Sequence, residues 1–138
     1  MSSKPKSRRE AREQAFIILF EKSFNEEMTF EEIFEIAVEA EVIEKNEFTE
    51  EIVFKAEKHM EEIDDEIRNN LKGWTMARIS KISLALLRMA ICEIKYCENV
   101  PTGVSINEAV EICKVYGSDE DKSFVNGVLG SVSRKLEV

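Results

Sequence analysis

The sequence predicts an all-helical fold in which two small antiparallel helical bundles share one core. The main observation is the stretch 78–96, which contains no Gly or Pro and whose apolar residues cover most of a helix circumference. A helix that is apolar on nearly all sides is buried, so this stretch is expected to be the central helix. With only five Gly and two Pro in 138 residues, the chain has few turn formers, and no segment alternates convincingly as a strand would.

The helical segments fall into two groups within one domain: an N-terminal group at residues 8–73 and a C-terminal group at residues 74–138. A length of 138 residues with 43% hydrophobic content is sufficient for one domain with its own core. Residues 1–7 are polar and basic and are expected to form a tail. Ser7 is placed to cap the first helix, which is expected over residues 8–24.

Capping signals predict the other N-terminal helices. Residues 29–32, Thr-Phe-Glu-Glu, match a capping box that starts a second helix. Thr49 is expected to cap a third helix. Asp64 or Asp65 is expected to restart the chain as a short helix that ends before Gly73.

The C-terminal group has similar signals after the central helix. Residues 105–108, Ser-Ile-Asn-Glu, match a second capping box, and Gly117 is expected to end the helix that it starts. Ser118 is expected to cap the last helix. Gly127 and Gly130 lie inside that last helix, where close backbone packing, against the central helix or against a partner, best explains them.

Cysteine usage and the N-terminus predict a cytoplasmic protein without a membrane span. Cys92, Cys97 and Cys113 lie in apolar helical segments and are expected to be reduced thiols. The basic start of the chain predicts no secretory signal. Charges interrupt the stretch 78–96 well short of the roughly 18 to 20 apolar residues of a membrane helix.

The sequence predicts no catalytic residue, metal site or cofactor. It contains no nucleophile elbow, Gly-rich phosphate loop or Cys-x-x-Cys spacing. The many carboxylates of residues 26–66 are interpreted as solvated helix faces, and His59 as a partly buried helix residue rather than a base. We therefore expect a protein that is not an enzyme.

The charge of the chain is strongly uneven. The net charge of -9 taken alone argues against nucleic-acid binding. Residues 23–68 carry 17 acids against four bases. Residues 1–12 carry one acid, Glu10, and five bases: Lys4, Lys6, Arg8, Arg9 and Arg12.

The arginines at the start of the first helix are the candidate ligand-binding group. Arg8 and Arg12 share a helix face, and Arg9 lies about 100° round the axis. Guanidinium groups bind phosphate bidentately and stack on bases, and arginine-rich segments serve RNA recognition. The alternative is a solubilising tip that pairs with Glu10, Glu13 or the acidic middle of the chain. The free helix N-terminus also favours anions, so we slightly favour phosphate binding over the solubilising tip.

A second basic row consists of Lys81, Arg88 and Lys95, which are seven residues apart along the central helix. Because its neighbours are expected to be buried, we interpret this row as the exposed edge of the helix, paired with acids of the N-terminal bundle.

Four segments resemble the NusB family of bacterial transcription antitermination factors. They are SRREAREQAFIILFE (7–21), RISKISLALLRMAICEI (78–94), VPTGVSINEAVEICKVYG (100–117) and KSFVNGVLG (122–130). Residues 25–72 show only the helical pattern. The resemblance implies an all-helical fold of two bundles and binding of boxA-type single-stranded RNA from ribosomal RNA operons. It also implies a heterodimer with the small-subunit ribosomal protein NusE, within a complex that helps RNA polymerase resist termination.

The resemblance also implies site residues. The arginine-rich start of the first helix would bind RNA, with Lys4 and Lys6 compensating for Ser7, which replaces a third arginine of some relatives. A further group near the last helix would also lie near the RNA: Glu120, Lys122, Ser123, Phe124 and Asn126. The expected NusE surface is Phe16, Phe20, Ser83 and Leu87.

Two other readings are weighed. A protein-interaction module without specific RNA binding would use the apolar line of Phe16, Phe20 and Phe24 for NusE or for a second copy of the chain, as a homodimer. A domain of a ribosomal RNA methyltransferase would need a cofactor-binding domain, for which 138 residues leave no room.

Overall fold

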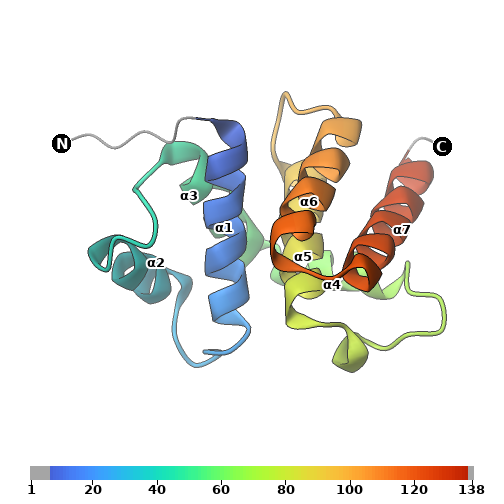
Figure 1. Cartoon of the computed structure of the whole chain (residues 1–138), viewed down its shortest axis with the longest axis horizontal. Coiled ribbons are helices and arrows are strands. Elements are labelled where there is room, and N and C mark those ends of the chain that lie inside the picture. Colours follow the sequence, from blue (N-terminus) through green and yellow to red (C-terminus); the bar gives the residue numbers. More distant parts are fainter. Residues whose placement is uncertain (1–6, 137–138) are drawn as a thin grey trace.

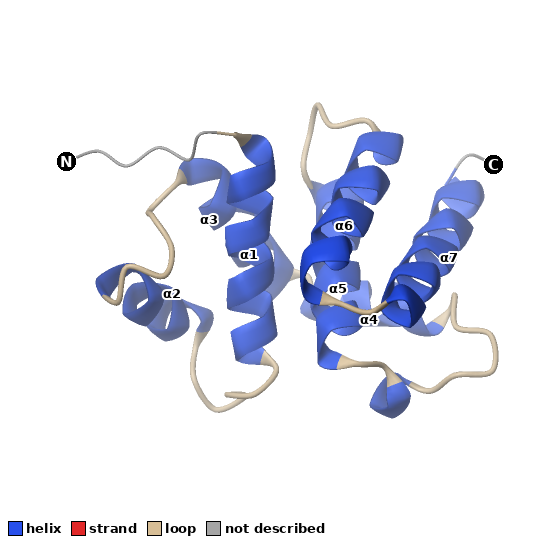
Figure 2. Cartoon of the chain, viewed as in Figure 1, coloured by secondary structure: helices blue, strands red, loops and turns tan. Residues whose placement is uncertain are grey.

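The structure is a computed structural model that describes residues 7–136, so Lys4 and Lys6 lie outside the described residues. Over this range the chain forms seven α-helices and one 3-10 turn and no strand, which confirms the all-helical prediction (Figure 2). The elements are α1 (Arg8–Lys22), α2 (Phe30–Glu39), α3 (Glu47–Lys58), α4 (Met60–Arg68), η1 (Met76–Arg78), α5 (Lys81–Tyr96), α6 (Thr102–Tyr116) and α7 (Asp119–Leu136).

Helix α5 is the centre of the molecule, as its sequence predicts. It packs against α1, α3, α4, α6 and α7, with α1 to α3 on one side and α6 and α7 on the other (Figure 1). Its N-terminus is Lys81 rather than residue 78, because the Ser80 hydroxyl accepts a hydrogen bond from the Ser83 amide at 3.0 Å and so caps the helix.

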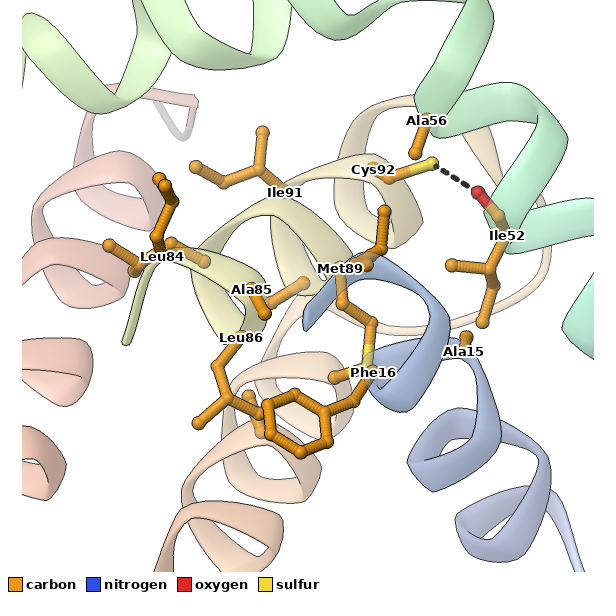
Figure 3. Packing of buried hydrophobic residues seen from close by; sticks show 14 of the residues in the cluster. Ala15, Phe16, Ile52, Ala56, Leu84, Ala85, Leu86, Met89, Ile91 and Cys92 are labelled. Atoms are coloured by element: carbon orange, nitrogen blue, oxygen red, sulfur yellow. Dashed lines mark hydrogen bonds between the residues drawn. The ribbon is translucent and has the colours of Figure 1, made fainter. Parts of the chain in front are cut away.

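All seven helices contribute to one hydrophobic core. At its middle, Ala15 and Phe16 of α1 meet Met89 of α5, and Cys92 lies against α3, where its thiol donates to the Ile52 carbonyl at 3.4 Å (Figure 3). This continuous core is the shared core that the sequence predicts. The division into subdomains at residue 73 stays a prediction.

Several helix starts follow the capping signals. The Ser7 hydroxyl accepts from the Glu10 amide at 3.2 Å. Thr29 and Glu32 form the expected capping box. Ser118 caps α7, because its hydroxyl accepts from the Asp121 amide at 3.0 Å.

Two other starts differ from the prediction. Asn46, not Thr49, caps α3, and the buried Thr49 hydroxyl donates to the Ala11 carbonyl at 3.0 Å. Helix α6 begins at Thr102 after Pro101, so the capping box predicted at residues 105–108 is wrong. Proline lacks the amide hydrogen that a helix start leaves unpaired, and it therefore fits there.

The N-terminal bundle also has shorter helices than predicted. Helix α1 ends at Lys22, and α4 is separated from α3 at His59 and ends at Arg68. His59 is partly buried, as expected, and its ring stacks on Tyr96 with centroids 3.8 Å apart. Gly73 lies in the following loop with φ +78°, a conformation that favours glycine.

Close backbone packing does not explain the two glycines of α7. A side chain at Gly127 would meet no atom within 4 Å, and one at Gly130 would meet only the Arg134 side chain. The expectation is therefore wrong for packing against the central helix, and packing of these glycines against a partner stays a prediction.

The three cysteines are free and buried. None of the helices between residues 7 and 136 is both long and apolar enough to cross a membrane.

Candidate nucleic-acid interface

The three arginines of α1 lie in three different environments. Arg8 is exposed, and its guanidinium lies 4.1 Å from the ring centroid of Phe48. Arg9 is half exposed and forms a bidentate pair with Glu108 of α6, at 2.8 and 2.7 Å. Arg12 is only 4% exposed. The sequence spacing predicted one ligand-binding group of Arg8, Arg9 and Arg12, whereas the tertiary structure places them in different surroundings.

Arg12 is held in a buried polar network that joins α1, α5 and α6. Its Nε donates to Glu93 at 2.7 Å, and Glu93 itself is 1% exposed. The other carboxylate oxygen of Glu93 accepts from the Ser105 hydroxyl at 2.5 Å. Because Arg12 is buried between Glu93 of α5, Glu108 of α6 and the Phe48 ring, the expected direct contact of this residue with RNA does not fit the structure. Arg12 instead fixes the helix that carries Arg8 and Arg9.

Arg9 and Glu108 form an ion pair between α1 and α6 at the protein surface. The hydrogen bond from Arg9 lowers the pKa of Glu108, against the opposing effect of partial burial. Glu108 is therefore a carboxylate at neutral pH and neutralises Arg9 in the free protein. Arg8 has no acidic partner among the described residues.

The second expected group lies at the start of α7, at the opposite end of α6 (Figure 1). Glu120, Ser123 and Asn126 are exposed, and Lys122 is half-buried and has no ion-pair partner among residues 7–136. Arg9 contacts Glu108 in the middle of α6, and the stretch of α6 from Glu108 to Tyr116 spans about 12 Å, so the expected RNA-binding residues form two clusters rather than one.

Phe124 is half-buried, as its helical period allows, and it packs against a residue that the sequence reasoning did not select. The Trp74 ring lies edge-on to Phe124 with centroids 5.7 Å apart, and the Arg78 guanidinium lies 5.7 Å from the Trp74 ring. The signal available in the sequence was the single Trp of the chain, placed beside Gly73 in a break between helices.

The residues expected to bind NusE are mostly internal. Ser83 and Leu87 are fully buried and Phe16 is 2% exposed, so in this conformation these three have no surface for a partner. Ser83 and Leu87 belong to α5, which is buried because it is apolar on nearly all sides. Phe20 is half-buried and lies 5.0 Å from Phe24, which is 58% exposed. Phe20 and Phe24 therefore form the accessible end of this line.

Two members of the basic row of α5 pair with acids of the N-terminal bundle, as the sequence predicts. Lys81 does not: its ammonium donates to the Ser23 carbonyl at 3.4 Å and has no acidic partner within residues 7–136. Arg88 forms a bidentate pair with Asp64 at 2.9 and 3.0 Å, and Lys95 pairs with Glu66 at 3.1 Å. Both acids belong to α4. Arg88 and Lys95 are therefore not available for a nucleic acid.

Together, the fold and the site define a small all-helical protein with exposed arginines on its first helix. Guanidinium groups of this kind are suited to binding phosphate. A model of the NusB family matches residues 9–134. This chain belongs to the NusB family.

The relatives are similar over nearly the whole chain. The transcription antitermination protein NusB of Finegoldia magna is 40% identical over 133 residues, with 95% of this chain and 96% of the relative aligned. That of Bacillus mycoides is 42% identical over 129 residues, with 94% and 98% aligned. A chain from a crystal structure of the antitermination factors NusB and NusE in complex with dsRNA is 27% identical, with a TM-score of 0.82 over 93% of this chain and 96% of that one.

Proposed function

We propose that this protein is an RNA-binding transcription antitermination factor that binds boxA-type RNA together with the ribosomal protein NusE. The observation that carries the proposal is the exposed edge of α1, where Arg8 is unpaired and Arg9 is only half-buried, in a chain of the NusB family. We propose a non-catalytic role. The protein would act in the cytoplasm, as part of the RNA polymerase antitermination complex on ribosomal RNA operons.

The geometry supports different roles for the basic residues in RNA binding. Arg8 is free to bind a phosphate, and Arg9 can exchange Glu108 for one, because both groups offer the planar oxygen pair that a guanidinium binds. Lys122 supplies a second contact at the far end of α6. A single strand that follows α6 from Glu108 to Tyr116, over about 12 Å, would run from one cluster towards the other.

The proposed NusE contact is the surface around Phe20 and Phe24. An exposed phenylalanine at the end of an aromatic line is a suitable anchor for a protein partner. The alternative occupant of this surface is a second copy of the chain.

The test is a fluorescence-anisotropy titration of labelled boxA-type RNA, with and without NusE, against a scrambled RNA and a double-stranded RNA. The R8A/R9A variant keeps Arg12 and should lose about 1 to 3 kcal/mol of binding free energy per arginine. The K45A/K58A variant is the matched control, because it removes the same charge from exposed side chains near α3. Equal loss in both variants would show non-specific electrostatics only.

The second candidate function is a protein-interaction module without specific RNA binding. Two observations favour it: Arg9 is already paired with Glu108, and Phe24, two residues after the end of α1, is the most exposed aromatic residue in the described part of the chain. In that case R8A/R9A would bind RNA like the wild type, whereas F24A would weaken NusE binding.

A further inference from the structure

Helix α2 has an exposed apolar face at the outer edge of the N-terminal bundle. The helix packs mainly against α1 and α3, on the side of α1 that is turned away from α6 and α7 (Figure 1). Ile36 in this helix is 57% exposed, and Val42 in the loop that follows it is 56% exposed. A helix face that meets only water normally carries polar residues. These two aliphatic side chains therefore mark a surface that the rest of the described chain leaves uncovered.

The backbone holds Val42 in a fixed position. Glu41 has φ +62°, the left-handed conformation that ends many helices and that residues with a side chain rarely adopt. The Glu41 amide donates to the Val38 carbonyl at 3.0 Å, and the Val42 amide donates to the Ala37 carbonyl at 2.9 Å. This pair of hydrogen bonds is the Schellman motif. Because the turn is already ordered, a partner that contacts Val42 loses little conformational entropy there.

Ile36 and Val42 border a groove between α1 and α2 with a volume of about 370 Å³. Most of the side chains that line it are apolar, among them Ile17, Met28, Ile33 and Ala37. The line of Ile17 and Glu21 runs about 100° round α1 from the line of Phe16 and Phe20. The groove is therefore a different surface from the proposed NusE contact.

The rim of this groove is acidic. Residues 21–44 carry nine acids and one base. Glu21 lines the groove itself, and Glu32 and Glu39 lie one turn before and one turn after Ile36 on α2. The groove thus combines an apolar floor with a negatively charged edge.

Charge selects the class of occupant. The single base of the segment, Lys22, does not offset the rim, because its ammonium is turned inward and donates to the carbonyls of Glu26 and Met28. A nucleic acid is repelled by such a rim. A second copy of the chain would place the same acids opposite one another in a symmetric interface. An amphipathic helix with Lys or Arg beside its apolar residues complements both the floor and the rim.

We propose that the α1–α2 groove binds a basic amphipathic helix of a protein partner, with aliphatic anchors against Ile36 and Val42 and cations beside the acidic rim. This site is separate from the proposed RNA contacts, because Glu21 is 12 residues along α1 from Arg9, about 18 Å. RNA and the partner helix can therefore be bound at the same time, and the protein can link the two.

The test is an anisotropy titration of full-length protein with a labelled designed peptide. The peptide has Leu at i, i+3, i+4 and i+7, and Lys and Ala elsewhere. One control peptide has Glu in place of every Lys, and a second has the same composition with its Leu residues scattered round the helix. We expect saturable binding of the first peptide alone. Methyl NMR signals of Ile17, Ile36 and Val42 should shift, whereas those of Val104 and Val115, which are exposed on α6, should not.

Variants with matched controls separate the groove from the rest of the surface. I36Q/V42Q should weaken peptide binding about 5- to 30-fold, because it removes the apolar anchors' contacts. V104Q/V115Q, which removes two exposed valines from α6, should bind normally. E21Q/E39Q should weaken binding and flatten its salt dependence more than E61Q/E62Q, which removes the same charge from α4. Thermal melting by circular dichroism checks that each variant is folded.

Several results would overturn the groove proposal. One is absence of saturable binding by the wild type, and another is an equal loss of affinity in V104Q/V115Q or E61Q/E62Q, which would show attraction to acidic protein in general. Loss of NusE binding in I36Q/V42Q would assign the groove to NusE, and a dimer in sedimentation that this variant dissociates would assign it to a second copy.

The RNA-binding proposal is tested independently on the same variants. I36Q/V42Q should bind boxA-type RNA like the wild type, whereas R8A/R9A should bind the peptide like the wild type. Failure of either proposal would therefore be visible while the other stands.

Discussion

At the scale of single residues, the network of Arg12, Glu93 and Ser105 links three helices through groups that are shielded from water. Removal of one member leaves a buried charge without its partner, which typically costs about 3 to 5 kcal/mol. We therefore predict that R12A lowers the free energy of unfolding in urea by about that amount. R8A should change it by about 1 kcal/mol or less, because Arg8 has only the exposed contact with Phe48. Similar stability of the two variants would show that the network contributes little.

Glu108 gives a residue-scale prediction that depends on pH. Its pKa is lowered in the folded protein by the hydrogen bond from Arg9, so the charged form is favoured by folding. This contribution is complete above the unfolded pKa of about 4.5 and is lost as the pH falls through the lower folded pKa. The wild type should thus be more stable than E108Q at neutral pH, and the difference should shrink below about pH 4.5. Urea unfolding across this range measures it, and a constant difference would contradict it.

At the scale of elements, two segments with the same capping pattern behave differently. Residues 29–32 form a capping box, whereas Ser105 of residues 105–108 turns inward to Glu93. The local pattern is sufficient at Thr29 because nothing upstream competes for the helix start. At Ser105 it is not sufficient, because α6 already begins after Pro101. Sequence therefore predicts that a helix exists better than it predicts where the helix starts.

The capping box of α2 can be tested directly. The Thr29 hydroxyl accepts from the Glu32 amide at 3.0 Å, and the Thr29 amide donates to the Glu32 carboxylate at 2.8 Å. T29A should lower the free energy of unfolding by about 0.5 to 2 kcal/mol. Hydrogen exchange should locate the loss in the first turn of α2. E35A, which removes an exposed carboxylate from the same helix, is the control and should leave exchange unchanged.

At the scale of the whole molecule, the central helix and the shared core were predictable because they depend on the apolar pattern of the chain. The accessibility of the site was not, because it depends on which helices pack together. Arg8 and Arg12 have the same local pattern, but only Arg12 is buried, where it pairs with Glu93 of α5. Likewise, Trp74 meets Phe124 only because the loop before α5 folds back on α7.

The charge of the whole molecule leads to a prediction about salt. With a net charge of -9, the protein opposes RNA everywhere except at its few free cations. If Arg8, Arg9 and Lys122 bind three phosphates, the logarithm of the RNA-binding constant should fall with the logarithm of salt concentration with a slope of about -2. A basic partner such as NusE adds phosphate contacts, so the slope of the complex should be steeper. Anisotropy titrations at several salt concentrations give both slopes. Equal slopes would mean that NusE strengthens binding by ordering this protein rather than by contacting RNA.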